Sequence, residues 1–289
     1  MKVSGFSFIR NALKFDYPIL ESIQSVLPLC DEFIIAVGNS DDKTLELIQS
    51  IKDPKIKIIE TVWDDTMRKG GRVLALETDK AFKEISKDSD WAFYIQGDEL
   101  IHEKDLAVIR DAMLKWKDDE KVDGLLFNYL HFYGSYNFVG NSRRWYRKEI
   151  RIIKNNPEIK SYRDAQGFRK NDQKLGVKAI DACVYHYGWV KPPEVQKEKL
   201  NNSRSLYRSD SEKTKRFPST DEFNYSAIDS LKHFEGSHPK LIQKRIDRIN
   251  WEFDFDPSIK NFDKRTAFLQ FIEKYTGWRI GEYKNYKKV

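Results

Sequence analysis

The chain has 289 residues, of which 40% are hydrophobic and 13% aromatic. It is long enough to bury a substantial core and too aromatic for a disordered protein. Lysine and arginine number 51 against 45 aspartate and glutamate, a net charge of +6 that suits an anionic substrate or a membrane surface. The positive charge is scattered, which argues against nucleic acid as a partner, and no run has the length of a transmembrane helix.

The first 116 residues alternate between short apolar runs and segments whose apolar residues are three and four apart. These are the periods of strands and helices. Fully apolar strands that alternate with helices indicate a parallel sheet covered on both faces, so the predicted fold class is α/β. The expected strands cover residues 3–9, 33–37 and 55–60 and a run that begins at Trp91; the expected helices cover 18–27, 44–51, 72–85 and 104–116.

After Val122 the rhythm changes, and long basic and aromatic loops separate the apolar runs. From Pro192 onward the chain is highly charged and mostly helical in pattern, and its segment 203–220, rich in Ser, Lys and Arg, predicts a mobile loop. The strands expected here cover 125–132, 150–154 and 182–187, and the helices 194–206 and 239–253.

Cysteine usage and the N-terminus bear on the cellular compartment. Cys30 and Cys183 lack the spacing of metal ligands and are expected to be free thiols. The first residues contain no apolar leader. We therefore expect a cytoplasmic protein, with peripheral contact to the inner face of a membrane left open.

Two adjacent carboxylates, Asp98 and Glu99, follow the aromatic run that begins at Trp91. A buried strand that delivers acids at its C-terminal end presents charge to a ligand crevice. Such oxygen ligands suit Mg²⁺ or Mn²⁺, and a divalent ion suits a bound diphosphate. The alternative is a polar turn between a strand and a helix, because Gly-Asp is an ordinary turn dipeptide.

Several motifs in chain order resemble those of a family-2-type glycosyltransferase with the GT-A fold. The strand end that carries Arg10 and Asn11 is similar to the family's first nucleotide-contacting strand. The turn from Ser40 through Asp42 to Thr44 matches the family's Ser-x-Asp-x-Thr motif after the second strand. The resemblance therefore implies that these residues contact the donor nucleotide.

Two further motifs complete the resemblance. Residues 96–99 stand where the family carries its metal-binding Asp-x-Asp signature, and His186 resembles a strand-end histidine that supplies a further metal ligand. The match covers residues 1–195, the expected GT-A catalytic domain. Residues 196–289 are expected to form a helical extension packed on or near the active site.

The chain departs from the family pattern in two places. Val37 and Gly38 replace an acidic pair before the serine motif, so the nucleobase preference does not carry over. Gln96 replaces the first aspartate of the metal signature. A glutamine hydrogen-bonds a ribose or phosphate well but is a poorer cation ligand than a carboxylate, which leaves Asp98 as the principal ligand.

The resemblance implies an inverting sugar transfer that needs Mn²⁺ or Mg²⁺, from a UDP- or GDP-sugar to a hydroxyl of a glycan or lipid-linked acceptor. Asp98 would hold the metal, with Glu99 as a second ligand or as a helix cap. His186 would be a third ligand or a hydrogen-bonded strand-end residue. Asp164 falls where such enzymes place the catalytic base, the alternative being a loop salt bridge, and Asp172 is a weaker competitor.

Other residues are candidates for binding the substrates. Arg72 enters a predicted helix, where backbone N–H groups favour phosphate, although a solvated arginine is as common there. Lys191 and Arg169 are further candidates for phosphate contact. The aromatic stretch 131–136, with Trp145 beyond it, predicts either an acceptor platform or core packing.

Two other functions stay open. A nucleotidyltransferase uses a similar α/β sheet and acidic metal site, but no glycine-rich triphosphate loop follows the first strand. A degenerate GT-A domain would bind a glycan or partner without catalysis, as Gln96 and the Val37-Gly38 pair would allow.

Overall fold

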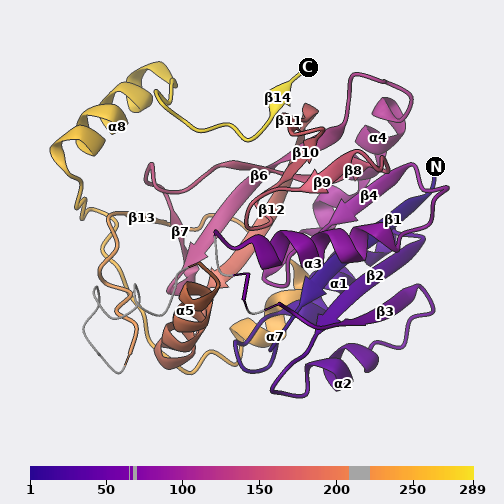
Figure 1. The fold of residues 1–289 in the computed structure, drawn as a ribbon. Helices are drawn as coiled ribbons and strands as arrows, with labels where there is room; N and C mark the ends of the chain where they lie inside the picture. Colours follow the sequence, from indigo (N-terminus) through magenta and orange to yellow (C-terminus); the bar gives the residue numbers. More distant parts are fainter. Residues whose placement is uncertain (65, 68–69, 208–221) are drawn as a thin grey trace.

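The computed structural model describes residues 1–64, 66–67, 70–207 and 222–289. A large twisted sheet runs through the molecule with helices on both of its faces (Figure 1). Its strand order is β13-β7-β6-β8-β4-β1-β2-β3, and β12 pairs with β6.

One half of the sheet is parallel, as the sequence predicts. β1 pairs in parallel with β2 and β4, and β2 pairs in parallel with β3. These strands span Val3–Ile9 (β1), Glu32–Gly38 (β2), Ile56–Thr61 (β3) and Trp91–Tyr94 (β4). The neighbouring helices span Ile19–Val26 (α1), Thr44–Gln49 (α2), Arg72–Lys83 (α3) and Leu106–Trp116 (α4). The α/β class is confirmed.

Alternating side chains of the buried strands pack into two hydrophobic cores, one on each face of the sheet. Phe33 and Ile35 of β2 pack with Ile109 of α4 on one face. Ile34 and Ala36 pack with residues of α3 on the other. Because successive strand side chains point to opposite faces, a fully apolar strand is required wherever both faces are covered.

Beyond β4 the sheet becomes mixed. β8 lies antiparallel between β4 and β6, and β6 turns into β7 through Gly134, whose φ of +72° favours glycine. An apolar run has the same period in either direction, so its pattern does not predict strand orientation. The remaining strands span Glu99–Ile101 (β5), Gly124–Tyr133 (β6), Ser135–Gly140 (β7), Lys148–Lys154 (β8), Ile159–Ser161 (β9), Phe168–Lys170 (β10), Gln173–Lys174 (β11), Gly176–Trp189 (β12), Leu231–His233 (β13) and Lys287–Lys288 (β14).

The C-terminal region is only partly helical. The prediction of one long helix over 239–253 is wrong. The chain forms only two short helices there, η3 (Lys240–Ile242) and α7 (Gln243–Ile246). The chain then leaves the helical path, and the Trp251 indole donates to the Gly134 carbonyl at 2.7 Å. α8 (Lys264–Thr276) was not predicted, whereas α5 (Pro193–Tyr207) was.

The predicted mobile loop 203–220 begins inside α5, and its residues from 208 onward lie outside the described part of the chain. The boundary between the two expected domains, after residue 195, stays a prediction.

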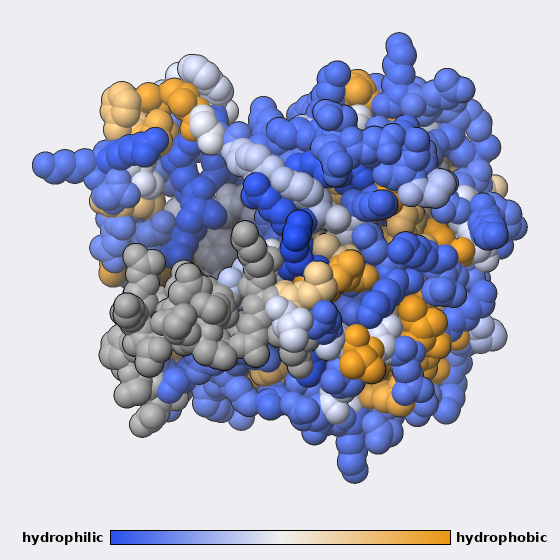
Figure 2. All heavy atoms as spheres, in the orientation of Figure 1, coloured by the Kyte–Doolittle hydropathy of each residue, from blue (hydrophilic) through white to orange (hydrophobic). Residues whose placement is uncertain are grey.

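Among the described residues, no helix combines the length and apolar character needed to span a bilayer. Both cysteines are free thiols, as expected. The face shown in Figure 2 is mostly hydrophilic.

Candidate active site

Two cavities meet at the loop that joins β9 to β10. The first, about 930 Å³, is lined by residues that include Arg72, Leu76, Asp164, Gln166, Asp172 and Tyr207. The second, about 580 Å³, is lined by residues that include His131, Tyr133, Trp145, Gln166, His186 and Trp189. Gln166 lines both, so the loop is their shared wall. Both volumes lie in the range of small-molecule sites.

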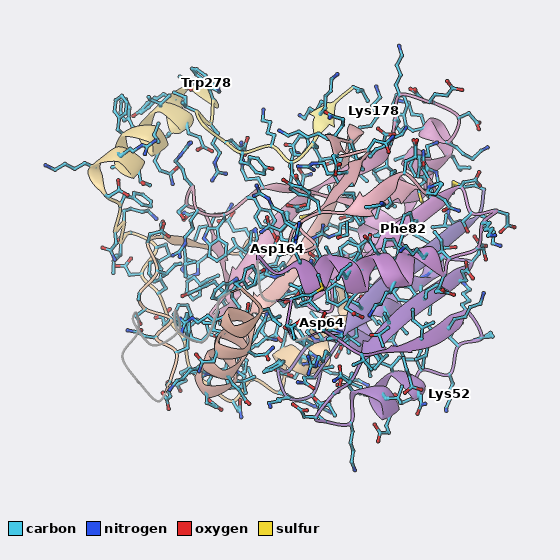
Figure 3. The ribbon with its side chains drawn as sticks, in the orientation of Figure 1. Lys52, Asp64, Phe82, Asp164, Lys178 and Trp278 are labelled. Atoms are coloured by element: carbon cyan, nitrogen blue, oxygen red, sulfur yellow. The ribbon has the colours of Figure 1, made fainter. Side chains whose placement is uncertain are left out.

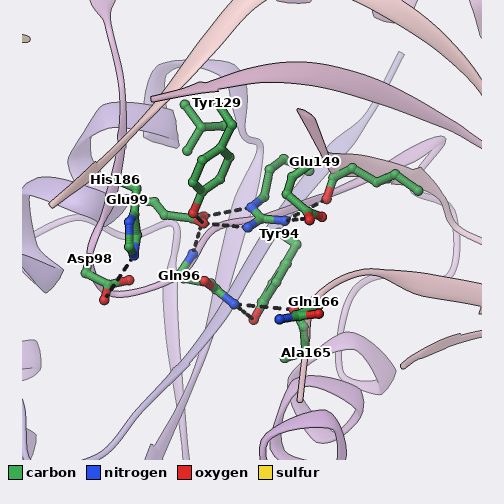
Figure 4. A network of polar contacts seen from close by, with 12 residues as sticks. Tyr94, Gln96, Asp98, Glu99, Tyr129, Glu149, Ala165, Gln166 and His186 are labelled. Atoms are coloured by element: carbon green, nitrogen blue, oxygen red, sulfur yellow. Dashed lines mark hydrogen bonds and ion pairs between the residues drawn. The ribbon is translucent and has the colours of Figure 1, made fainter. Parts of the chain in front are cut away.

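The loop between β9 and β10 holds Asp164 in strained backbone. Arg163 and Ala165, on either side of it, have φ of 56° and 62°, the left-handed region that non-glycine residues rarely adopt. The Gln96 side chain donates to the Ala165 carbonyl at 3.3 Å, which ties the loop to the end of β4 (Figure 4). Such strain of about 1–3 kcal/mol per residue persists where surrounding structure enforces it, most often at functional sites.

Two helices meet at Asp164. The Tyr207 hydroxyl, at the end of α5, donates to Asp164 Oδ2 at 2.7 Å. Gly71 precedes α3 with φ of +69°, and a Cβ there would lie 2.7 Å from Asp164 Cβ. Only glycine suits this close approach. Figure 3 shows Asp164 beside the start of α3. The carboxylate is thus held in place at the wall of the first cavity.

Asp98 and His186 lie side by side, as the metal hypothesis requires. β5 pairs antiparallel with β12, which places His186 opposite Glu99 and next to Asp98. His186 Nε2 is 3.6 Å from Asp98 Oδ2 (Figure 4). Lys199 Nζ, from α5, lies 3.0 Å from the same oxygen and donates to the Gly188 carbonyl. Burial opposes ionisation, but Lys199 and His186 outweigh it and hold the Asp98 pKa well below its usual value.

Glu99 lies outside the candidate site, contrary to both expectations for it. It is fully buried in β5 and caps no helix. Arg151 Nε donates to Glu99 Oε2 at 2.7 Å, and the backbone N–H of Gln96 donates to the same oxygen. Arg151 Nη2 and the Tyr129 hydroxyl both donate to Oε1 (Figure 4). Because both oxygens are engaged by buried donors, Glu99 stabilises the strand ends, and neither oxygen is open to a metal ion in this arrangement.

Glu149, next to this buried cluster, is expected to make the stability of the fold depend on pH. Burial raises its pKa to about 8, although Arg151 lies 3.6 Å away and opposes the shift. The folded protein therefore keeps a proton that the unfolded chain loses near pH 4.5. We expect the stability of the wild type relative to Glu149→Gln to fall by up to about 1.4 kcal/mol per pH unit between pH 5 and 8.

Urea denaturation of both proteins at pH 5, 6, 7 and 8 measures this difference. It should be largest in favour of the wild type at pH 5 and level off above pH 8. Parallel stability curves for the two proteins would show that Glu149 titrates normally in the fold.

The candidate nucleotide-binding loops after β1 and β2 are joined by hydrogen bonds. The backbone N–H of Asn11 donates to Ser40 Oγ at 3.0 Å, and the backbone N–H of Asp41 donates to the side-chain oxygen Oδ1 of Asn11 at 2.8 Å. Asp42 Oδ2 accepts from the Lys14 amide at 2.7 Å. The structure thus brings Asn11, Ser40 and Asp42 together, and it uses the Asp42 carboxylate to hold the two loops.

The predicted phosphate-binding arginines are in different settings. Arg10 Nε donates to the Asn39 carbonyl, and its guanidinium lies 5.4 Å from the centroid of the Trp63 ring. Arg72 is exposed and lines the first cavity. Arg169 is buried and lies 3.9 Å from the Tyr162 ring centroid, so it supports the loop.

Lys191 is buried close to Asp98. Its Nζ donates to the Asp16 carbonyl at 2.6 Å and lies 4.8 Å from the Tyr17 ring centroid, while Lys199 lies 4.9 Å from the same centroid. Burial lowers the Lys191 pKa to about 7. A bound anion would favour its charged form, so this pair of amines suits a phosphate-bearing ligand.

The aromatic platform expected over 131–136 exists in part. Tyr133 lines the second cavity with Trp145, whereas Tyr136 packs in the core. His131 and His186 have ring centroids 5.2 Å apart, and burial holds the His131 pKa well below its usual value. The cavity therefore combines aromatic faces with a neutral imidazole, a lining suited to sugar rings.

Lys199 and Tyr207 are site residues that the sequence interpretation missed. Both belong to α5, whose expected residues end at 206 and carry no recognisable motif. Only the docking of this helix brings one side chain to Asp98 and the other to Asp164.

The fold and the site define an α/β protein with two cavities that share a carboxylate-bearing wall. The sequence matches no protein-family model and no curated protein. Solved structures that the chain is similar to include TarS from S. aureus, at 15% identity and a TM-score of 0.40, covering 70% of this chain and 39% of TarS. This chain thus spans well under half the length of TarS.

Two synthases are also among these similar structures. The 4-diphosphocytidyl-2C-methyl-D-erythritol synthase of Anaerococcus prevotii matches at 15% identity and a TM-score of 0.41, over 71% of this chain and 97% of the synthase. The glucosyl-3-phosphoglycerate synthase of Mycobacterium tuberculosis, in complex with Mn²⁺, UDP and glucosyl-3-phosphoglycerate, matches at 16% identity and a TM-score of 0.30, over 46% and 45%. At these scores the similarities carry no functional assignment, so the function is argued from this chain's own residues.

Proposed function

We propose that this protein is a glycosyltransferase that moves a sugar from a nucleoside-diphosphate sugar to a hydroxyl of a glycan or lipid-linked acceptor. One observation carries the proposal: two cavities of substrate size meet at a strained loop that carries Asp164 on the wall of the first. A transfer between two substrates needs two adjoining sites with a proton acceptor near their junction.

In the proposed reaction the two substrates occupy the two adjoining cavities, with the diphosphate of the donor at Asp98 beside His186, a residue that lines the second cavity. Asp164 takes the proton of the acceptor hydroxyl as that oxygen bonds to the anomeric carbon. The bond from that carbon to the diphosphate breaks, and the diphosphate leaves with the electron pair. The attack comes from the side opposite the leaving group, so the configuration inverts. Lys199 places positive charge beside Asp98, where we expect the diphosphate, and the diphosphate would favour the charged form of Lys191.

The residues present fit a divalent ion in a partial way. The burial of Asp98 does not prevent its ionisation, and His186 Nε2, the nitrogen that an ion shared with Asp98 would need, lies 3.6 Å from Asp98 Oδ2. No third His, Cys, Asp or Glu among the described residues joins them. Asp98 and His186 would hold Mn²⁺ or Mg²⁺ together with diphosphate oxygens and water. When bound, the ion neutralises charge on the departing diphosphate.

Calorimetry with UDP, GDP, CDP and ADP, each with Mn²⁺ or with EDTA, tests the proposal. We expect one diphosphate to bind, and Asp98→Ala to weaken that binding by at least tenfold. Binding of none would favour a glycan- or partner-binding domain. Release of pyrophosphate from a nucleoside triphosphate would identify a nucleotidyltransferase instead.

A further inference from the structure

α8 presents a row of aromatic side chains to solvent. Phe268 is 63% exposed, Phe271 60% and Tyr275 68%, and Trp278 just beyond the helix is 65% exposed. The first three are spaced three and four residues apart, so they share one face of the helix. Figure 2 shows hydrophobic atoms gathered over α8, and Figure 3 shows Trp278 at the outer edge of the molecule. A contiguous exposed apolar face of this kind usually marks an interaction site.

The opposite side of α8 is anchored, which fixes this face outward. Glu273 accepts from Arg143 at 2.7 Å and lies within 4 Å of Arg147 and Arg279. The Thr266 amide donates to Asp263, which caps the helix. The exposure of the aromatic rings is therefore a consequence of how α8 is held.

The charges on α8 indicate the partner. Glu273 is the helix's single acidic residue, and its carboxylate is turned toward the three arginines. Lys264, Arg265 and Lys274 are exposed on the same helix as the rings. A surface with aromatic rings and lysines, from which the one carboxylate of the helix is turned away, complements an anionic lipid surface, where rings enter the headgroup region and lysines meet phosphates. A second copy of the same helix would set lysines against lysines, because its Glu273 is already paired with arginines.

We propose that the outer face of α8 docks this protein on an anionic membrane surface. The contact is peripheral: the rings of Phe268, Phe271 and Tyr275 enter the interface and Lys264 and Lys274 contact lipid headgroups. The docking does not depend on the proposed transfer reaction, because no residue of α8 lines either cavity at the site. It would serve a lipid-linked acceptor by holding both substrates' sites at the bilayer surface.

Co-sedimentation with vesicles tests this docking. The full chain is mixed with vesicles of phosphatidylcholine alone or of phosphatidylcholine with 30% phosphatidylglycerol, a composition chosen for its negative charge. We expect at least tenfold tighter binding to the anionic vesicles. The paired change Phe268→Ser and Phe271→Ser should lower that binding at least tenfold, and Lys264→Glu with Lys274→Glu should do the same.

The matched control is Leu114→Ser, which removes another exposed apolar side chain, on α4, and should leave vesicle binding unchanged. Circular dichroism and thermal unfolding confirm that each variant is folded. Equal binding of wild type and the phenylalanine variant would overturn the proposal. So would a wild-type dimer that binds no vesicles and dissociates in that variant. Nucleotide binding by the same variants reports on the transferase proposal separately, since α8 should not affect it.

Discussion

Asp164→Asn is expected to lower the rate of sugar transfer by about 10²- to 10⁴-fold, the usual contribution of a general base. Asparagine keeps the size of the side chain and accepts the Tyr207 hydrogen bond through its amide oxygen, so the loop should keep its shape. It does not accept a proton from the acceptor. Donor binding, measured by calorimetry, should therefore change by less than about threefold while turnover collapses.

Asp172→Asn is the matched control for this experiment. Asp172 lines the same cavity but sits in the β10–β11 turn, and it was the weaker candidate for the base. We expect it to retain near wild-type turnover. Full activity in Asp164→Asn would show that Asp164 is not the general base. A collapse of turnover in Asp172→Asn alone would assign that role to Asp172. Loss of donor binding with normal turnover at saturating donor would make Asp164 a structural residue.

Arg151→Met is expected to destabilise the fold by about 3–5 kcal/mol, the largest change in stability that we predict. Arg151 is 1% exposed and pairs with the fully buried Glu99, and its guanidinium lies 5.5 Å from the ring centroids of Tyr94 and Tyr129. Methionine fills most of the volume but leaves the Glu99 carboxylate without its counterion. Urea unfolding at pH 7 measures the loss.

A double-mutant cycle identifies the cause. Glu99→Gln combined with Arg151→Met removes both charges, so much of the lost stability should return, because an uncompensated buried charge is the main penalty. Lys2→Met, which breaks the exposed pair with Asp88, should show no measurable change. If the double variant is as unstable as Arg151→Met, cavity formation instead of charge explains the loss.

The local pattern of the chain predicted the parallel half of the sheet and the location of Asp98. Both depend on periodicity that each segment carries by itself: apolar strands covered on two faces, and an acid where such a strand ends. The α5 helix was predicted for the same reason. The pattern was misleading at 239–253, where tertiary contacts of Trp251 prevail over helical periodicity.

The roles of the neighbouring acids required the tertiary structure. Asp98 and Glu99 are adjacent in sequence, yet one lies beside His186 and Lys199 and the other is enclosed by Arg151. Asp98 belongs to the turn between β4 and β5, whereas Glu99 is the first residue of β5, so the two carboxylates enter different environments. The local sequence does not show which neighbours each of the two carboxylates has in the fold.

The sequence by itself thus determined the α/β class, the order of the first strands and helices, and a short set of candidate acids. Only the tertiary structure decided which acids share a cavity, which residues of α5 reach them, and that α8 turns its aromatic face outward. The physical reason is that periodicity is a property of neighbouring residues, whereas a site joins side chains such as Asp98 and Lys199, which are 101 positions apart. Their meeting depends on how whole elements dock.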